Sequence, residues 1–216
     1  LKIKKFNKNF KKFIQVSTDE VYGSTTISKP FNHLTRYNPS SPYSASKASS
    51  DHLVLSWAKT YNLPFIITNC SNNFGPRQFP EKLIPLTIEK LFRGENITLY
   101  GDGLQKRDWI YVDDHVKGLI LAAKNGINGN TYLFGSGTAT SNKVIVKNLI
   151  KIFKKSTDIK YISKIVYVQD RPAHDKLYLI DPKETKKKLN WIYKSNLFKE
   201  LELTFMWYKN NRNWCK

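Results

Sequence analysis

The sequence has few cysteines and no long apolar run. Its two cysteines, Cys70 and Cys215, lie close neither to each other nor to a histidine along the chain. This scarcity argues against a disulfide framework and against a zinc site, whose ligands are closely spaced, and it predicts a reducing, cytoplasmic compartment. No apolar run approaches the ~20 residues that span a bilayer, so no membrane partner is expected. The lysine-rich first residues lack the apolar core of a secretory signal.

Glycine is missing where a dinucleotide-binding fold would use it. The 10 glycines never form a GxGxxG or GxxGxxG turn, which is the element that cradles phosphate after the first strand of such a fold. The chain also opens inside a segment with helical spacing and without an initiating methionine. We therefore expect it to be the later portion of something longer.

The formal net charge of +19 is of the size found in nucleic-acid-binding proteins. The lysines that produce it are scattered along the whole chain, however, so no nucleic-acid partner is expected. The few arginines are more informative, because Arg77, Arg107 and Arg171 lie beside Gly, Pro or Asp in loop-like segments. A planar guanidinium there can grip phosphate in a bidentate manner, although a surface ion pair explains any one of them equally well.

Apolar spacing predicts an α/β layered fold in which helices alternate with short strands. The composition, 40% apolar with 13% aromatic residues, supports a packed core. Residues 71–76 are predicted as a loop. Helices are predicted over residues 3–13, 40–61, 81–93, 113–125, 141–155 and 196–210, and strands over 13–17, 64–70, 96–100, 108–112, 130–134 and 165–168.

Two adjacent carboxylates, Asp19 and Glu20, follow directly after the apolar, β-prone run 13–16. In the middle of a buried sheet, unpaired carboxylates would be costly. At the carboxyl end of a parallel strand, the same pair points into the crevice where α/β folds bind ligands. A helix cap or a solvated turn is the other interpretation of this pair taken alone.

Tyr43 and Lys47, in the segment YSASK, lie four residues apart and share one face of the predicted helix 40–61. The Ser-Ser-Pro sequence at 40–42 is suited to begin that helix. A nearby ammonium favours the phenolate and lowers a pKa that starts near ~10, so Tyr43 is a candidate general base or acid. Such a pair also arises by chance. The order of strand, Ser-Thr, linker, YxxxK helix and second strand makes the arrangement more specific.

Five segments of the chain carry a resemblance to a known family. The segments are VSTDEVYG, PSSPYSASKASSDHLV, NCSNNFGPRQFPEKLIP, YGDGLQKRDWIYVDDH and DRPAHD. From about Lys12 to Trp214, the sequence resembles the extended short-chain dehydrogenase/reductase family that acts on nucleotide sugars, and within it the dTDP-glucose 4,6-dehydratases. The YxxxK element alone indicates only the superfamily. The triplet 18–20, Thr-Asp-Glu, is more selective, because epimerase relatives have small residues at the two acidic positions.

The resemblance implies an NAD-dependent lyase of deoxysugar biosynthesis. Such enzymes oxidise the sugar at C4, remove water across C5 and C6, and return the hydride to C6. The resemblance implies that Glu20 is the base at C5 and Asp19 the proton donor to the leaving hydroxyl. Neighbouring like charges separate the two pKa values, which supports such a division. Thr18 would hydrogen-bond the C4 oxygen, Tyr43 would take its proton, and Lys47 would bind the nicotinamide ribose and tune Tyr43.

The same resemblance implies a set of residues that bind the nucleotide sugar, dTDP-glucose. Asn73 would lie on the nicotinamide side of the site and, with Tyr43 and Lys47, would bind the NAD cofactor. No metal is expected. The implied substrate-binding residues, in addition to Thr18, are Asn72, Lys82, Leu83, Thr98, Tyr100, Arg107, Asp170, Arg171, His174 and Tyr178.

The implied fold is the C-terminal part of a Rossmann-type parallel sheet plus a smaller α/β substrate-binding domain. Residues 1–73 and 107–134 would be the remnant of the dinucleotide-binding domain, with the catalytic residues. Residues 74–106 and 135–216 would form the nucleotide-sugar-binding domain. Four preceding βα units, roughly 120 residues at ~30 per unit, would be missing, which would leave the strand 13–17 with an open edge. We expect no activity unless a preceding segment or a complementary chain supplies them.

The sequence departs from the family pattern at two places in the substrate region. Leu133 stands where relatives have a nucleotide-binding asparagine, and Ser136 replaces a glycine. Ala173 replaces the glycine of the DRPGH loop, which matters only if φ is positive there. Alternative functions therefore stay open: a non-catalytic nucleotide-sugar-binding remnant, or a related dehydratase acting on UDP-glucose.

Other residues have plainer interpretations. Asp113 and Asp114 are expected to cap a helix. The family resemblance implies a homodimer formed through the YxxxK helix. The apolar residues of that helix would form such a surface or would pack against the sheet; they are Leu53, Leu55 and Trp57. Three histidines without ligand spacing are expected to be structural or exposed; they are His33, His52 and His115.

Overall fold

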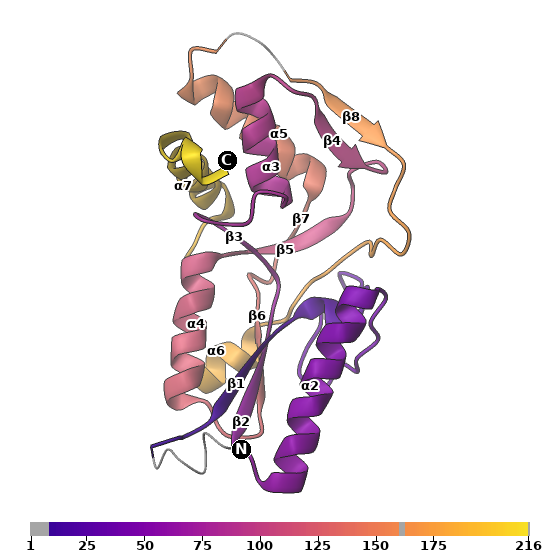
Figure 1. Ribbon diagram of the computed structural model, residues 1–216, viewed down its shortest axis with the longest axis vertical. Helices are drawn as coiled ribbons and strands as arrows, with labels where there is room; N and C mark the ends of the chain where they lie inside the picture. The colour runs from indigo at the N-terminus through magenta and orange to yellow at the C-terminus, as the bar shows by residue number, and fades with distance from the viewer. Residues whose placement is uncertain (1–8, 160–162, 216) are drawn as a thin grey trace.

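The computed structural model describes residues 9–159 and 163–215 as an elongated α/β protein. Two layered parts lie one above the other in Figure 1, with a parallel sheet in the lower part and a helix-rich layer in the upper part. The predicted α/β fold class is confirmed. No helix in the described ranges is both long enough and apolar enough to cross a membrane.

The lower part is built on a parallel sheet with the strand order β1-β2-β6. The strands are β1 (Phe13–Thr18), β2 (Phe65–Cys70) and β6 (Thr131–Phe134). The central strand β2 is buried along almost its whole length. Such a run is expected where helices cover both faces of a parallel sheet. Because the strands are parallel, β1 and β2 end at the same edge, with Thr18 beside Cys70.

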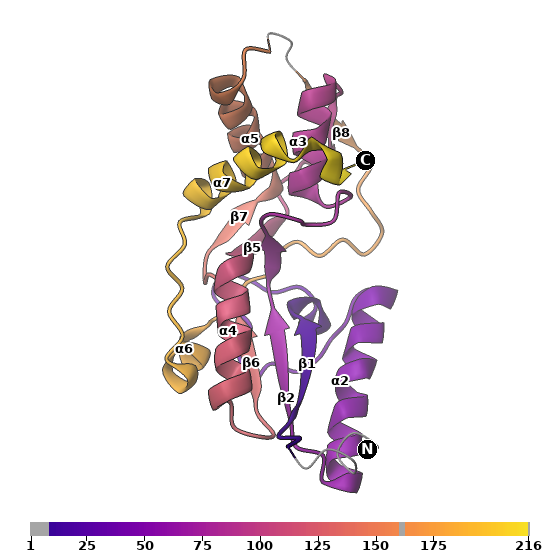
Figure 2. The same ribbon diagram turned by 60° about the vertical axis from the view of Figure 1, so that its left-hand side comes forward.

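Helices α2 (Pro42–Tyr61) and α4 (Val112–Asn125) lie on opposite faces of this sheet, as Figure 2 shows. Successive side chains of β2 point to opposite faces. Phe65 and Ile67 therefore share a buried cluster with Val54 of α2. Ile66 shares another with Ala122 of α4. The alternating side chains of β2 thus pack against both helices, one helix on each face of the sheet.

One edge of the sheet is open within the part of the chain that the structure describes, because β1 pairs only with β2. Phe13 and Val16 of β1 are 41% and 46% exposed. An apolar strand edge of this kind is a template for a further strand. The predicted open edge is therefore confirmed. The apolar residues of α2 at 53, 55 and 57 are also exposed, so they do not pack against the sheet.

The upper part consists of three helices packed over short strands. Its core contains Trp109, Phe153 and Phe205 among other buried apolar residues. The helices are α3 (Leu83–Arg93), α5 (Asn142–Ser156) and α7 (Leu197–Asn210), followed by the 3-10 turn η2 (Arg212–Cys215). One sheet contains β3 (Asn72–Phe74), β5 (Lys106–Tyr111) and β7 (Ala139–Ser141), and a parallel pair contains β4 (Ile97–Tyr100) and β8 (Ile165–Val168).

A buried aspartate connects β5 to two neighbouring segments. Asp108 is fully buried and accepts hydrogen bonds from the backbone N–H groups of Ser136, Gly137 and Ile180. The Ser136 hydroxyl donates one more, at 2.6 Å. The serine that replaces the glycine of relatives therefore adds a hydrogen bond that glycine does not provide.

Asp114 has a comparable role, and the prediction that Asp113 and Asp114 cap a helix is wrong. The N-cap of α4 is Tyr111, which makes no capping bond with its side chain. The Asp114 carboxylate instead accepts the backbone N–H groups of Lys194 and Ser195, at 3.4 and 3.1 Å. It thereby fixes the segment that runs from α6 (Lys183–Leu189) to α7.

The predicted elements agree with the structure wherever periodicity or capping is strong. Gly94 ends α3 in the left-handed conformation. The strands β3 and β7, the helix α6 and both 3-10 turns were not predicted, and β3 lies within the segment predicted as a loop. Most of the predicted helix 3–13 lies outside the described residues. Residues 10–12 are not helical, so that part of the prediction is wrong.

A substitution on α4 tests the packing of this helix on the sheet. A Cβ atom at Gly118 would lie 2.4 Å from the Phe134 ring, and that ring is held edge-on against Trp191 at 5.1 Å. We expect Gly118→Ala to lower the free energy of unfolding by about 1–3 kcal/mol, because overpacking outweighs the ~1 kcal/mol that alanine gains in a helix. Urea unfolding measures it. The exposed Lys124→Ala is the control, and a Gly118→Ala protein as stable as the parent would contradict the packing described.

Candidate active site

The predicted acidic pair lies in η1 (Asp19–Tyr22), a 3-10 turn that begins where β1 ends. Thr18 is the N-cap of this turn, and its Oγ1 accepts a hydrogen bond of 3.3 Å from the Glu20 backbone N–H. The cap satisfies a backbone donor that the turn would otherwise leave unpaired. The turn directs Asp19 inward, where it is 2% exposed, and leaves Glu20 on the wall of a pocket. The predicted position at the carboxyl end of a parallel strand is confirmed.

Asp19 is a buried carboxyl group with little hydrogen bonding. Its Oδ1 accepts a long bond of 3.5 Å from the Thr18 hydroxyl, and no hydrogen-bond partner for its Oδ2 exists in the described ranges. Burial raises the pKa of Asp19 well above its usual range, and the charges of Glu20 and Asp108 raise it further. Arg107 opposes this with a smaller effect. Asp19 therefore keeps its proton at pH values where ordinary aspartates have lost theirs.

The surroundings of Glu20 differ from those of Asp19. Burial raises its pKa as well, and Asp175 adds to that effect. Three cations act in the opposite direction, because Arg107, Lys82 and Arg171 each lower the pKa of Glu20. Glu20 therefore ionises more readily than its buried neighbour. The pKa of both carboxyl groups is raised, but three cations oppose the rise at Glu20, whereas the cation that opposes it at Asp19 is Arg107.

Tyr43 and Lys47 lie in the first two turns of α2. The pKa of Tyr43 is raised, first by burial and then by nearby negative charges that include Glu20 and Asp19. The predicted lowering of this pKa by Lys47 is therefore wrong in this structure. The Lys47 ammonium instead donates a hydrogen bond of 3.0 Å to the Val16 carbonyl. The phenol nevertheless lies within electrostatic reach of both carboxyl groups, so the acidic turn and the YxxxK helix meet.

A pocket of about 730 Å³ extends from Glu20 into the upper part of the molecule. Its size lies in the range of small-molecule and cofactor sites, ~300–1,000 Å³. The fold brings together side chains from η1, β3, α3, β4, β5 and the 170–178 loop. The predicted residues that line the pocket are Glu20, Asn72, Lys82, Leu83, Thr98, Tyr100, Arg107, Arg171, His174 and Tyr178.

Arg107 is a buried cation on the pocket wall, 6% exposed. Its guanidinium donates to the backbone carbonyls of Lys106 and Asp175, at 2.8 and 2.9 Å. The same group lies 4.3 Å from the centre of the Tyr178 ring, and the Tyr178 hydroxyl donates to the Asp175 carboxylate at 2.6 Å. Burial lowers the pKa of Arg107, but an arginine stays charged in proteins. The arrangement fixes a positive charge where an anionic group can meet it.

The loop after β8 carries the second cation, Arg171, whose guanidinium lies 5.1 Å from the centre of the Tyr100 ring. Asp170 orders this loop. Its Oδ1 accepts the Arg171 backbone N–H at 2.8 Å and lies 2.6 Å from His174 Nδ1. Its Oδ2 accepts from the Gln105 amide at 2.9 Å. Asp170 does not line the pocket, and its carboxylate supports the loop. Its contact with substrate stays a prediction.

Ala173 occupies the left-handed region of backbone conformation in the same loop, with φ at +53°. The condition that makes the loss of glycine costly is therefore met. An L-residue in this region costs roughly 1–2 kcal/mol. The pocket wall at this point contains backbone strain that a glycine would not have.

Asn73 lies beside the pocket and uses its side chain inside the protein. Its Oδ1 is 2.9 Å from His115 Nδ1, and its amide donates to the Ser71 carbonyl at 3.1 Å. Burial lowers the pKa of His115 to about 4, so this histidine is neutral and structural. The cofactor contact of Asn73 stays a prediction. Other predicted residues outside the pocket lining are Thr18, Asp19, Tyr43 and Lys47.

Sequence reasoning missed several pocket residues. Asn142, the first residue of α5, lines the pocket, and its buried Oδ1 has no partner within the described part of the chain. Leu133 is buried in β6 and does not line this pocket, so the departure noted there removes no contact from it. The sequence signal that could have identified Asn142 is its position directly after a serine N-cap. The other missed residues are Ser41, Gln78, Glu81, Leu86, Lys90, Trp109, Pro172, Ala173 and Asp175.

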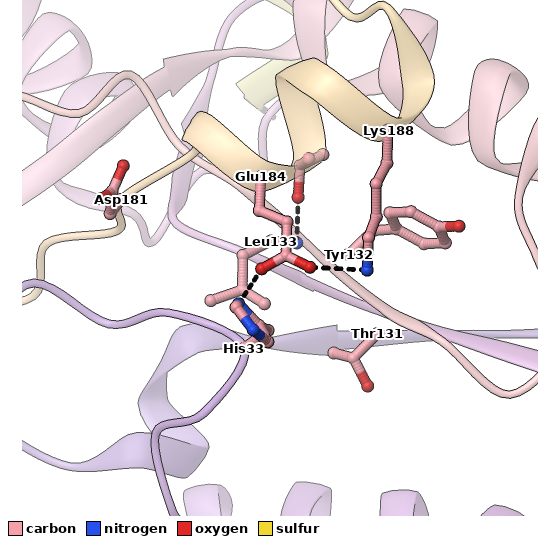
Figure 3. Close-up of a pocket in the computed structure, with 8 residues that line it drawn as sticks. His33, Thr131, Tyr132, Leu133, Asp181, Glu184 and Lys188 are labelled. Atoms are coloured by element: carbon pink, nitrogen blue, oxygen red, sulfur yellow. Dashed lines mark hydrogen bonds and ion pairs between the residues drawn. The ribbon is translucent and has the colours of Figure 1, made fainter.

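A second pocket, shown in Figure 3, holds only about 10 Å³, about the space of one water molecule. Glu184 of α6 pairs there with His33 and Lys188, and the Thr185 hydroxyl accepts the Leu133 N–H at 2.9 Å. These contacts attach α6 to the sheet. Across the described ranges, no group of three or more His, Cys, Asp or Glu side chains could hold a metal ion.

The raised pKa of Asp19 predicts a specific dependence of stability on pH. The folded state holds this proton more tightly than the unfolded state, so stability is lost as pH rises from about 4 through the folded-state pKa. We expect Asp19→Asn, which cannot ionise, to be more stable than the parent at pH 7. The difference should shrink below about pH 4. Urea unfolding across pH measures it, with the exposed Asp158→Asn as the control. A less stable Asp19→Asn protein at pH 7 would show that Asp19 is not a destabilised, buried acid.

The left-handed φ of Ala173 predicts that restoring glycine stabilises the loop. We expect Ala173→Gly to raise the free energy of unfolding by about 1 kcal/mol. The matched control is Ala123→Gly on the exposed side of α4, which should lower the same quantity by about 1 kcal/mol. Thermal or urea unfolding measures both, and a loss of stability in both variants would argue against the strained conformation.

Comparison with known proteins supports the relation inferred from the motifs. Residues 2–203 match the family model described as GDP-mannose 4,6 dehydratase. A dTDP-glucose 4,6-dehydratase from Escherichia coli is 44% identical over 218 residues, which cover 94% of this chain and 60% of that protein. One from Neisseria meningitidis is 43% identical and covers 94% and 59%. A solved dTDP-glucose 4,6-dehydratase from Bacillus anthracis in complex with NAD has a TM-score of 0.86 at 41% identity, covering 94% of this chain and 63% of that one.

The matched region has two properties that matter here. It covers nearly all of this chain, but the chain spans only about 60% of the length of these curated relatives. The residues that match the family model, 2–203, include the acidic turn and the pocket. The chain belongs to the GDP-mannose 4,6-dehydratase family.

Proposed function

We propose that this chain is the catalytic and substrate-binding part of an NAD-dependent dTDP-glucose 4,6-dehydratase, a lyase that forms dTDP-4-keto-6-deoxyglucose. One observation carries the proposal. Asp19, whose pKa burial raises well above its usual range, and Glu20, where three cations oppose the effect of burial, lie side by side at one end of a pocket that also contains Arg107 and Arg171. The similarity to dTDP-glucose 4,6-dehydratases supports the choice of substrate.

The acidic pair would perform the elimination. Removing water across C5 and C6 needs a base and an acid in opposite protonation states. Glu20 would take the proton from C5, and Asp19 would give its proton to the C6 hydroxyl, which leaves as water. The step leaves Glu20 protonated and Asp19 ionised. Glu20 can then return its proton to C5 when C6 is reduced.

The residues around the C4 oxygen would prepare this step. When bound, NAD⁺ would supply reversible hydride transfer, so that oxidation at C4 acidifies the C5 proton beside the new ketone and the hydride is later returned to C6. Tyr43 would exchange a proton with the C4 hydroxyl while Thr18 hydrogen-bonds the same oxygen. Since burial and the nearby carboxyls hold Tyr43 in its phenol form, a positive charge close to the phenol would favour its role as a base.

The residues present fit only one end of the cofactor. The Lys47 ammonium uses one of its three protons on Val16, and its other N–H groups would hold the nicotinamide ribose. The glycine-rich turn that binds the diphosphate is missing from the sequence. The open edge of β1, with Phe13 and Val16 exposed, is where the remaining strands would add. A preceding segment or a complementary chain would supply them.

The rest of the pocket would bind the nucleotide sugar. Arg107 and Arg171 would hold the diphosphate, since guanidinium groups match phosphate oxygens in geometry and charge. Asn142 would offer its unpaired Oδ1 to a donor on the ligand. In this proposal residues 1–73 and 107–134 form the remnant of the Rossmann domain. Residues 74–106 and 135–216 form the substrate domain.

The exposed apolar side of α2 would form a homodimer interface. Leu53 and Trp57 lie one turn apart there, 59% and 43% exposed, and Trp57 contacts the Tyr61 ring at 4.8 Å. Two further functions compete with the main proposal: a dehydratase acting on UDP-glucose, and a remnant that binds nucleotide sugars without catalysis.

Turnover distinguishes the main proposal from the remnant. The purified chain with dTDP-glucose and NAD⁺ should form no 4-keto-6-deoxy product, because the cofactor lacks most of its site. The N-terminal segment of the Escherichia coli relative, the part that this chain does not match, should then be added as a separate polypeptide. This addition should restore product formation, measured by chromatography. Complex formation without any product would favour the remnant, and product from the chain alone would show that the site is complete.

The base assignment is tested in the enzyme completed by that segment. We expect Glu20→Gln to lower product formation by at least about a hundredfold, as is typical for loss of a general base. Binding of dTDP should change by less than threefold, since Gln keeps the shape of Glu20. Glu202→Gln, on α7, is the matched control. Full activity of Glu20→Gln would remove the assignment.

A further inference from the structure

A buried carboxyl group on α2 has no part in the proposed mechanism. Asp51 is 0% exposed and belongs, with Ala48 and Val54, to the buried side of α2. The buried side of a helix is normally apolar, and a carboxyl group placed there is costly unless hydrogen-bond donors meet it. The donors that meet Asp51 therefore indicate which segments it connects.

Two hydroxyl groups converge on one oxygen of Asp51. The Ser17 hydroxyl donates to Oδ2 at 2.6 Å, and the Tyr37 hydroxyl donates to the same atom at 3.0 Å. The other oxygen, Oδ1, is buried without a hydrogen-bond partner in the described ranges. Ser17 lies near the end of β1 and is itself 3% exposed, whereas Tyr37 lies in the linker before α2. Asp51 thus joins β1 and this linker to the helix.

The bond to Ser17 lies next to the acidic turn. Lys47, one turn before Asp51 on α2, donates to the Val16 carbonyl at 3.0 Å, so two side chains one helical turn apart hold two successive residues of β1. The next residue, Thr18, is the N-cap of the acidic turn. Within the part of the chain that the structure describes, β1 has a neighbouring strand on one side only. The position of its end therefore depends on the bonds from α2.

Resting on the proposed function, we propose that Asp51 is a positioning residue, which fixes the acidic turn against the helix that carries Tyr43 through its bond to Ser17. Elimination needs the acidic pair and the phenol to reach one sugar ring, and small displacements of reacting groups lower the rate steeply. Asp51 does not line the pocket, so it acts through Ser17 and not on the ligand. Loss of the bond would let the turn move and water reach Asp19, which is 2% exposed.

NMR titration of the whole chain, with carbon-13 in the aspartate carboxyls, tests the proposal without turnover. We expect Ser17→Ala to lower the pKa of Asp19 by about 1 or more, because hydration favours the charged form. Tyr37→Phe is the matched control, since it removes a hydrogen bond to the same oxygen and keeps the ring that packs 5.2 Å from the Tyr22 ring. In this control the pKa of Asp19 should change by less than about 0.3. Equal changes in both variants would overturn the proposal.

A second pair of variants separates position from charge, and it decides the question if Ser17→Ala fails to fold. Asp51→Asn and Asp51→Ala both remove the negative charge, but only asparagine keeps an oxygen that can accept from Ser17. Asp51→Ala should therefore lower the pKa of Asp19 as Ser17→Ala does, and Asp51→Asn should leave it within about 0.3 of the parent value. A fall of the same size in both, or in neither, would overturn the positioning role. Circular dichroism shows whether each variant is folded.

Turnover in the completed enzyme separates this inference from the proposed function. Ser17→Ala should lower kcat by about tenfold or more and leave KM for dTDP-glucose within about twofold, since Ser17 does not line the pocket. Tyr37→Phe should change neither. A raised KM with unchanged kcat in Ser17→Ala would contradict positioning of the acidic turn. A parent that forms no product would overturn the proposed function, while the pKa of Asp19 would still show whether Asp51 fixes the turn.

Discussion

The burial of one carboxyl group at the end of β1 is the constraint on which the rest of the site depends. Asp19 has no charged partner of its own and leaves Oδ2 unpaired within the described residues. Protein interiors usually exclude such a group. Here the Thr18 cap turns the chain inward, and burial raises the pKa of Asp19 well above its usual range. Strongly shifted carboxyls of this kind mark functional sites.

The remaining architecture places the acidic turn at the wall of the pocket. Parallel strands end at one edge, so the acidic turn faces the upper part of the molecule. Arg107 is fixed by two carbonyls and by the Tyr178 ring, and it acts electrostatically on both members of the acidic pair. The cations lower the pKa of Glu20 more effectively than that of its buried neighbour. The proposed division of roles between the two adjacent acids thus rests on the deeper burial of Asp19 and on the cations that act on Glu20.

The sequence predicted what local signals and family motifs encode. Three predictions rest on a local physical reason and match the structure. They are the cap and the proline at the start of α2, the apolar run of β2 and the acidic pair after β1. The strands β3 and β7 have three residues each, too few for a period to show. The pKa of Tyr43 and the partner of Lys47 depend on how α2 lies against β1, which spacing along a helix does not determine. Asn142 enters the pocket only through the packing of α5.

The most direct test of this account is the ionisation of Asp19 itself. Carbon-13 labelling of the aspartate carboxyls and NMR titration of the chain, with Asp19→Asn to assign the signal, would give its pKa. The account predicts a value well above the ~3.9 of an ordinary aspartate, with Glu20 ionising at lower pH. A pKa of Asp19 at or below the ordinary value would contradict the claim that burial in this turn raises that pKa.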